Sequence, residues 1–240
     1  MQQRLPSLRE RPIAFAHRGA RAHAPENTLE SFALALRLGA TGIESDVWIT
    51  SDGIPVLDHD GVIRRGLRRV PIAEFKRSEL PSHIPTLREL IEHCGVDYEL
   101  SLDIKDARGF LPVAQTLRDH GFDPPRVWLC YWDLDILIST KKSLPDFRLV
   151  NSTRIKKVSE GLERRAHRLR EHGIDCLNMH HSDWNGGSVA LVHRFDVFAF
   201  SWDLQFEDAL STAYLMGVDA VYSDYVDRMV DTYRDILGQP

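Results

Sequence analysis

The sequence is poor in cysteine and has no long apolar stretch, and both absences narrow the class of protein. Its 240 residues include three cysteines, Cys94, Cys130 and Cys176, widely spaced in apolar segments. An odd number at such spacing argues against a disulfide framework or a zinc site and predicts reduced, buried thiols in a cytoplasmic protein. No apolar run approaches the roughly 18 residues of a membrane span, so we expect no integral membrane association. The polar segment 1–11 lacks the apolar region of a signal peptide.

A surplus of positive charge is also missing. Thirty basic and 35 acidic side chains give a formal net charge of −5, which argues against a broad nucleic-acid-binding surface but allows a local basic patch. The densest basic run, Arg64–Arg69, is either a solvated face or a region that attracts an anionic substrate. The length suits one α/β barrel of about 250 residues, and no linker or low-complexity segment interrupts it, so residues 1–240 are expected to form a single domain.

Short apolar segments rich in β-forming residues alternate with segments of helical periodicity, the pattern of a parallel sheet with crossover helices. Eight segments predict strands: Ile13–His17, Gly42–Val47, Tyr98–Ile104, Arg126–Tyr131, Phe147–Asn151, Cys176–Met179, Val197–Trp202 and Ala220–Asp224. Six segments between them predict helices: Thr28–Leu38, Leu87–Cys94, Leu111–His120, Leu134–Lys142, Glu160–His172 and Glu207–Met216. Several of these helices are followed by glycine, which closes a helix in the left-handed conformation. Eight β/α units in a chain of this size predict a closed (β/α)8 TIM barrel.

One excursion, Ser51–Pro85, breaks this rhythm after the second strand. It is far longer than a usual strand-to-helix loop, and Asp52-Gly53 predicts a tight turn leading into Ile54–Leu57. Long loops of this kind are usually functional. This one contains His59.

Acidic and basic side chains alternate along two of the predicted strands. Residues two apart on a strand point to the same face, so Glu44 and Asp46 project together, as do Asp103 and Lys105. In a barrel this phase turns all four inward, toward the end where active sites are built. Each alone is more simply explained as part of a surface ion pair. Together they favour a hard divalent cation, Mg²⁺ or Ca²⁺, with Lys105 assisting in charge neutralisation.

Two histidines are placed to reach a ligand of these carboxylates from different sides. His17 ends the first strand and precedes Arg18-Gly19, where glycine allows close backbone approach and the guanidinium offers a fork to a phosphate. His59 lies in the excursion after the second strand. A general base and a general acid require such a pair. Of the other histidines, His180 and His181 remain candidates for rim contacts, and the rest are expected to be ordinary surface or core side chains.

Two further features have a structural explanation, and the second also has a functional one. In Pro25-Glu26-Asn27-Thr28, either Asn27 or Thr28 caps the following helix. Trp202, at the end of the seventh predicted strand, either lines a pocket for an alcohol moiety or simply packs at the barrel rim.

Taken together, these motifs resemble the glycerophosphodiester phosphodiesterase family. The resemblance rests on a series of matches: His17-Arg18-Gly19, Pro25–Thr28, Gly42–Val47, Thr50–Gly53, His59-Asp60, Ile84–Leu87, Asp103-Ile104-Lys105, Trp202, Gly217–Ala220 and Asp224. The matches span nearly the whole chain and are densest before Lys105. Asp103 departs from the family pattern, which has glutamate at that position. The excursion also lacks the family's usual R-T-T pattern after the HD pair.

The resemblance implies a TIM barrel that hydrolyses glycerophosphodiesters to sn-glycerol 3-phosphate and an alcohol with the help of a divalent cation. The site residues that it implies are the catalytic pair His17 and His59, the phosphate-binding Arg18 and Lys105, and the metal ligands Glu44, Asp46 and Asp103. The base and acid roles of the two histidines are exchangeable, and the attacking oxygen is either water or the glycerol 2-hydroxyl. The expected partner is a small-molecule glycerophosphodiester, with oligomeric state left open.

Two alternatives accompany this hypothesis. One keeps the barrel and changes the substrate, giving lysophospholipase D or sphingomyelinase D-like activity on lipid phosphodiesters. It requires an exposed apolar patch or an amphipathic surface helix beside the site, and the sequence shows no strong one. The other is a non-catalytic phosphate-binding barrel. Both histidines and both carboxylates of the second strand are present, which argues against it.

Overall fold

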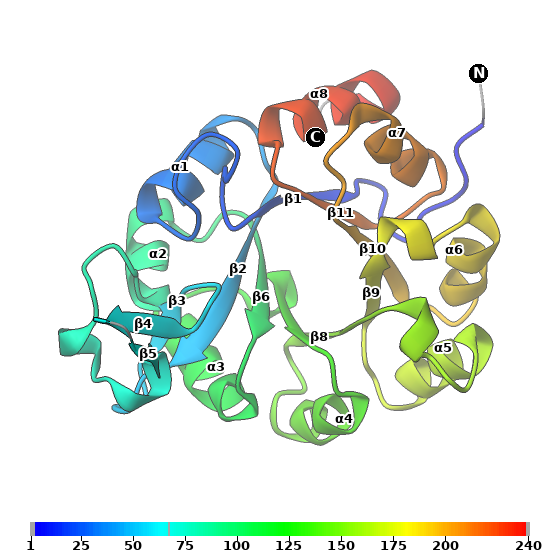
Figure 1. Ribbon diagram of the computed structural model, residues 1–240. Helices are drawn as coiled ribbons and strands as arrows, with labels where there is room; N and C mark the ends of the chain where they lie inside the picture. The colour runs from blue at the N-terminus through cyan, green and yellow to red at the C-terminus, as the bar shows by residue number, and fades with distance from the viewer. Residues whose placement is uncertain (1–2, 67, 239–240) are drawn as a thin grey trace.

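The chain folds into a closed barrel of eight parallel strands surrounded by helices (Figure 1). The computed structural model describes residues 3–66 and 68–238. Around the barrel the strands run in the order β1, β2, β6, β7, β8, β9, β10 and β11, and β11 pairs with β1 to close the ring. The predicted TIM barrel is therefore confirmed.

The element bounds follow the predicted segments closely. The barrel strands are β1 (Ile13–His17), β2 (Gly42–Ile49), β6 (Glu99–Ile104), β7 (Val127–Tyr131), β8 (Arg148–Thr153), β9 (Cys176–His180), β10 (Phe198–Trp202) and β11 (Ala220–Ser223). The predicted helices are α1 (Leu29–Arg37), α2 (Leu87–Cys94), α3 (Phe110–Asp119), α4 (Leu134–Ser143), α5 (Leu162–Glu171) and α7 (Glu207–Leu215). Two more helices, α6 (Gly186–His193) and α8 (Val226–Leu237), were not predicted from the sequence.

The barrel interior changes from apolar to charged along its axis. Its lower part is filled by aromatic and small side chains, including the stacked rings of Phe15 and Tyr222, whose centroids are 4.8 Å apart. Gly42 lies beside Phe15 in the register of β1 and β2. A Cβ at Gly42 would come within 2.5 Å of the Phe15 ring, so only glycine leaves room for it. This apolar plug forms a floor beneath the polar residues at the carboxyl ends of the strands.

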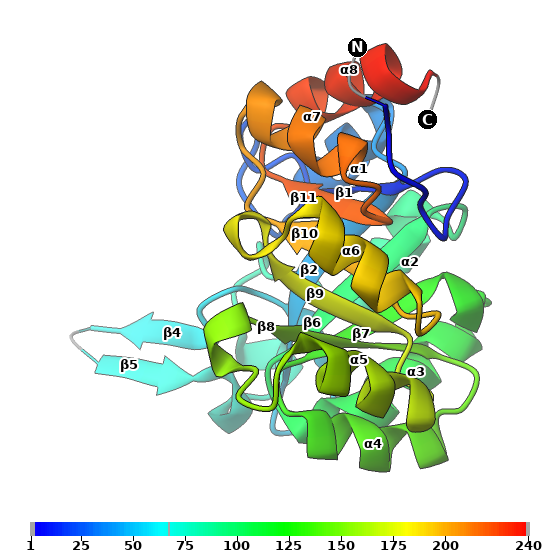
Figure 2. The same ribbon diagram turned by 90° about the vertical axis from the view of Figure 1, so that its right-hand side faces the viewer.

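The long excursion forms a small subassembly of its own. β3 (Pro55–Leu57) pairs antiparallel with β2, after the predicted turn at Gly53, where φ is +81°. β4 (Val62–Arg65) and β5 (Arg68–Pro71) form a hairpin that extends away from the barrel (Figure 2). The exposed arginines of the basic run lie on this hairpin.

The three cysteines are free thiols. Cys130 and Cys176 are buried inside the barrel, as predicted. Cys94, also predicted to be buried, is instead half-buried on α2. Among the described residues, no helix is both long and apolar enough to cross a bilayer.

Candidate active site

All eight residues proposed from the sequence line one cleft. It has a volume of about 530 Å³ and lies at the carboxyl ends of the barrel strands. The eight are His17, Arg18, Glu44, Asp46, His59, Asp103, Lys105 and Trp202. The cleft floor includes Cys130 and Tyr222 from the apolar plug, together with Ser101, whose hydroxyl lies 3.0 Å from the Tyr222 hydroxyl. Active sites of TIM barrels are built at this end.

Strand register brings the acidic residues together. In the parallel pairing of β2 with β6, Asp46 lies beside Asp103 and Glu44 lies beside Ser101. The intervening residues of β2, Ile43 and Val47, are buried against the helices. This alternation turns the carboxylates inward, as the period of two predicts.

Two cations neutralise Asp46. The Lys105 ammonium lies 2.7 Å from Asp46 Oδ1 and 2.5 Å from Asp103 Oδ2, and Arg18 Nε lies 3.1 Å from Asp46 Oδ2. Burial alone would raise the pKa of Asp46, but Lys105 and Arg18 outweigh it and hold the pKa below its ordinary value. Asp46 is therefore an anion at neutral pH, with Lys105 between it and Asp103.

Glu44 is less fully compensated. It is buried, and its Oε2 accepts a hydrogen bond of 3.0 Å from the Arg18 backbone N–H. Burial, together with the charges of Asp46 and Asp103, raises the pKa of Glu44 to about 7. The raised pKa means that the nearby positive charges do not fully compensate the Glu44 carboxylate for its burial.

His17 is held between two carboxylates. Its Nδ1 lies 2.6 Å from Asp224 Oδ1, and its Nε2 lies 3.9 Å from Glu44 Oε2. Burial disfavours the imidazolium, but Glu44 and the hydrogen bond to Asp224 outweigh it and raise the pKa of His17. Because a carboxylate accepts from Nδ1–H, Asp224 fixes the tautomer that leaves Nε2 free to accept a proton.

Asp224 was not assigned a role from the sequence, although it was among the matched residues. It follows β11, the strand that closes the barrel against β1, so it meets His17 from the opposite end of the chain. The sequence feature that could have predicted its role is its position at the carboxyl end of the last barrel strand.

His59 reaches the cleft from the excursion. Its side chain is 41% exposed, and its Nδ1 lies 3.0 Å from Asp60 Oδ1. His59 thus belongs to the rim of the cleft, while His17 lies deeper.

The loop after β1 is shaped by unusual backbone conformations. Arg18 and Asn27 both have positive φ, +56° and +55°, which is rare for residues other than glycine. Thr28, rather than Asn27, caps α1. The Asn27 side chain instead accepts a hydrogen bond from Ser45 Oγ at 2.8 Å and donates to Asp46 Oδ2 at 3.4 Å. Asn27 therefore supports a carboxylate of the site, a role that the capping interpretation missed.

The side of the cleft away from the carboxylates holds unpaired polar atoms. Trp202 Nε1 and Asn178 Oδ1 are buried, and neither has a hydrogen-bond partner among the described residues. Both residues line the cleft. Buried polar groups without partners are rare and mark positions for a ligand or water.

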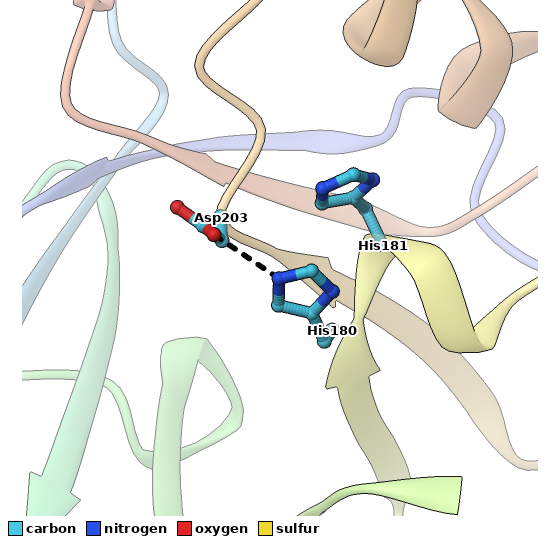
Figure 3. A group of neighbouring side chains, drawn as sticks. All are labelled: His180, His181 and Asp203. Atoms are coloured by element: carbon cyan, nitrogen blue, oxygen red, sulfur yellow. Dashed lines mark hydrogen bonds and ion pairs between the residues drawn. The ribbon is translucent and has the colours of Figure 1, made fainter.

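Among the described residues, one group of three has ligand atoms that all lie within 4.8 Å of one another: His180, His181 and Asp203. Figure 3 shows these side chains. The carboxylate oxygens of Glu44, Asp46 and Asp103 do not form such a group, in which one ligand atom of each residue lies within 4.8 Å of the others.

A model of the glycerophosphoryl diester phosphodiesterase family matches residues 17–228. The chain belongs to this family. The match includes every one of the eight proposed site residues. It also includes Asp224.

Individual relatives agree with this membership. Over 103 residues the chain is 43% identical to rat glycerophosphodiester phosphodiesterase 1, and the match covers 36% of this chain. It spans 31% of the length of that relative.

Solved structures share the fold of this chain. The glycerophosphodiester phosphodiesterase of Thermotoga maritima is 24% identical with a TM-score of 0.80, covering 92% of this chain and 97% of that chain. A phosphodiesterase of Oleispira antarctica, solved in complex with the product sn-glycerol-3-phosphate, is 24% identical with a TM-score of 0.80. That likeness covers 92% of this chain and 96% of that one.

Proposed function

We propose that the protein hydrolyses glycerophosphodiesters to sn-glycerol 3-phosphate and an alcohol, with the help of Mg²⁺ or Ca²⁺. The observation that carries the proposal is the arrangement of His17, oriented by Asp224, beside the Glu44 carboxylate in the cleft that His59 also lines. Family membership and the product complex of the Oleispira antarctica neighbour support the same chemistry.

The residues of the cleft fit a hard divalent cation. Glu44, Asp46 and Asp103 offer carboxylate oxygens, the ligands that Mg²⁺ and Ca²⁺ prefer. The raised pKa of Glu44 reflects a shortage of positive charge that a divalent cation would relieve. When bound, the cation supplies charge stabilisation at the phosphoryl oxygens. Binding requires Lys105 to give up a contact, because its ammonium now bridges Asp46 and Asp103.

Arg18 and Lys105 are the proposed phosphate ligands. The Arg18 side chain is largely buried and is held by Asp46 and Glu26. Its orientation is therefore set before substrate arrives, which favours stabilisation of the charge on the phosphate. Lys105, released from the carboxylates, is free to bind the same group.

The two histidines carry the proton transfers. His17 Nε2 takes a proton from the attacking oxygen, and Asp224 stabilises the resulting imidazolium through Nδ1. His59, on the exposed rim, protonates the leaving alkoxide. The attacking oxygen is water or the glycerol 2-hydroxyl, and the second route passes through a cyclic phosphate that water then opens.

Phosphorus NMR of glycerophosphocholine tests the proposal. With Mg²⁺ or Ca²⁺ we expect conversion to sn-glycerol 3-phosphate that stops on addition of EDTA, and a transient cyclic phosphate resonance would identify attack by the 2-hydroxyl. His17→Ala and His59→Ala should each lower kcat about 10²- to 10⁴-fold. His23→Ala, outside the cleft, is the matched control. If no glycerophosphodiester is turned over with either metal, the proposal is wrong. Unchanged activity in the double variant of His17 and His59 would refute the catalytic assignment.

A second candidate function, lysophospholipase D or sphingomyelinase D-like activity, is favoured by one observation at the same end of the barrel. Trp132 follows β7 and is 68% exposed, and Phe206 follows β10 and is 73% exposed. Exposed aromatic rings of this kind suit a lipid interface. Activity on lysophospholipid vesicles that falls in Trp132→Ser and Phe206→Ser, but not in Val96→Ser, would establish this candidate. Equal activity in all three would reject it.

We also propose that the protein works in a reducing compartment, the cytoplasm, as the three free thiols indicate.

A further inference from the structure

Three polar side chains line the cleft on the side away from the carboxylates. Asn178 lies on β9, Trp202 is the last residue of β10, and Asp203 follows it. These two neighbouring strands lie across the ring from β2, which carries the acidic residues. None of the three side chains takes part in the proposed proton transfers or in phosphate binding, so a partner for this side of the cleft is still to be assigned.

Two of these side chains have a buried polar atom without a partner. Asn178 is 6% exposed, and its Nδ2 donates to Ser152 Oγ at 3.3 Å. Its Oδ1, an acceptor, and Trp202 Nε1, a donor, have no hydrogen-bond partner among the described residues. A buried polar atom that stays unpaired costs free energy. In the wall of a cleft, these two atoms therefore point to a ligand that pairs with them.

Asp203 is held by two neutral donors. His180 Nδ1 accepts the backbone N–H of Ser182 at 3.1 Å, so the ring proton is on Nε2. His180 Nε2 donates that proton to Asp203 Oδ2 at 3.0 Å (Figure 3). Gln205 Nε2 donates to Asp203 Oδ1 at 3.2 Å. Each carboxylate oxygen accepts more than one hydrogen bond. Asp203 is thus oriented by its neighbours and still able to accept from a ligand.

The surroundings of Trp202 favour a hydroxyl over a cation. The Arg154 guanidinium lies over the indole ring, 5.7 Å from its centroid, where a ligand cation would otherwise bind. The Trp202 N–H is a donor, and an ammonium group has no lone pair to accept from it. A hydroxyl both donates and accepts, so it can pair with Trp202 as well as with Asn178 and Asp203. The polar atoms of this side therefore suit a group that carries hydroxyls.

We propose that Asn178, Trp202 and Asp203 form a subsite that binds hydroxyl groups of the substrate, either those of glycerol or those of the esterified alcohol. The inference rests on the proposed function, because it assigns a second part of the same substrate molecule. Its test uses binding as well as turnover, so that the two can fail separately.

The binding test compares two ligands of the same skeleton by calorimetry in the presence of Mg²⁺. They are sn-glycerol 3-phosphate and n-propyl phosphate, which lacks both hydroxyls. The variants Asn178→Leu and Trp202→Phe keep an apolar side chain of similar shape and remove the unpaired polar atom. Trp132→Phe is the matched control, because Trp132 is 68% exposed and is not among the described residues that line the cleft. Circular dichroism checks the fold of each variant.

We expect the wild type to bind n-propyl phosphate about 5- to 140-fold more weakly than sn-glycerol 3-phosphate, because a ligand without hydroxyls leaves buried polar atoms unpaired. Asn178→Leu and Trp202→Phe should each bind sn-glycerol 3-phosphate about 2- to 12-fold more weakly, and n-propyl phosphate no more weakly than the wild type. Trp132→Phe should leave both affinities unchanged. Unchanged affinity for sn-glycerol 3-phosphate in both cleft variants, or an equal loss for the two ligands, overturns the subsite alone. If the wild type binds neither ligand, the proposed function fails with it.

Turnover identifies which part of the substrate the subsite binds. If kcat/KM of Asn178→Leu falls equally on glycerophosphocholine and on glycerophosphoglycerol, the hydroxyls are those of the glycerol that both share. A fall confined to glycerophosphoglycerol assigns them to the esterified alcohol, because esterified choline has no free hydroxyl. Asp203→Asn tests for a cation instead. A fall confined to glycerophosphocholine in that variant overturns the proposal, since the subsite would then bind the ammonium group.

Discussion

The pairing of His17 with Asp224 leads us to predict that Asp224→Asn changes both kcat and its pH dependence. Asp224→Asn keeps the size of the side chain and removes its charge, so the charge-assisted hydrogen bond of 2.6 Å to His17 Nδ1 is lost. Both side chains are partly buried, with exposed fractions of 27% and 21%. A hydrogen bond to a charged group contributes about 1.5–3 kcal/mol. At about 1.36 kcal/mol per tenfold, kcat should fall about 10- to 160-fold.

The pH dependence should move in a known direction. Asp224 raises the pKa of His17, although burial opposes it, so removing the carboxylate lowers that pKa. The limb of the pH–rate profile that belongs to His17 should therefore shift to lower pH. If His17 is the general base, this is the acidic limb; if it is the general acid, it is the basic limb. The profile thus assigns the two roles.

The assay is steady-state turnover of glycerophosphocholine at saturating metal across the pH range. Asp227→Asn is the matched control, because Asp227 pairs with His23 at 3.0 Å in the same way. Its rate and profile should match the wild type. A wild-type rate and profile in Asp224→Asn, or an equal loss in Asp227→Asn, would refute the reasoning.

Three further predictions follow from the packing and charges of the site. Lys105→Met should lower kcat/KM about 10- to 100-fold, because a charged contact to the phosphate is lost. The same substitution should tighten Mg²⁺ binding measured by calorimetry, because the carboxylates of Asp46 and Asp103 are freed. Weaker Mg²⁺ binding would contradict this. In EDTA, the free energy of unfolding should fall as pH rises from 5 to 8, because the folded pKa of Glu44, about 7, lies above its unfolded value. Urea denaturation should show that added Mg²⁺ or a Glu44→Gln substitution reduces this decline, because His17, whose folded pKa is also raised, contributes the remainder. A decline of undiminished size in the variant would assign it to another group. Gly42→Ala should cost about 1–3 kcal/mol of unfolding free energy by overpacking against Phe15, and an unchanged denaturation midpoint would show that the ring moves aside.

Local periodicity was sufficient to predict much of the site. The alternation along β2 and β6 assigns Glu44, Asp46 and Lys105 to the inner face without knowledge of the register, because the period of a strand is two. Helix α8 carries the same kind of signal, since its buried residues Val226, Met229 and Tyr233 recur at helical spacing. That helix was therefore predictable.

Other features depend on tertiary structure and had no local signal. Helix α6 begins with two glycines, which are weak helix formers, and its apolar residues do not gather on one face. The bridging position of Lys105 depends on the register of β2 against β6. The approach of Asp203 to His180 likewise depends on the register of β9 against β10.

The closure of the ring between β1 and β11 has a consequence for folding. His17 and Asp224 are 207 positions apart in the chain, and their hydrogen bond crosses the last seam of the barrel. An intermediate in which this seam is still open can contain every helix and most strands, yet its His17 has no orienting carboxylate. Recovery of catalytic activity during refolding would therefore time the final joining of the two ends, a step that far-ultraviolet circular dichroism would barely register.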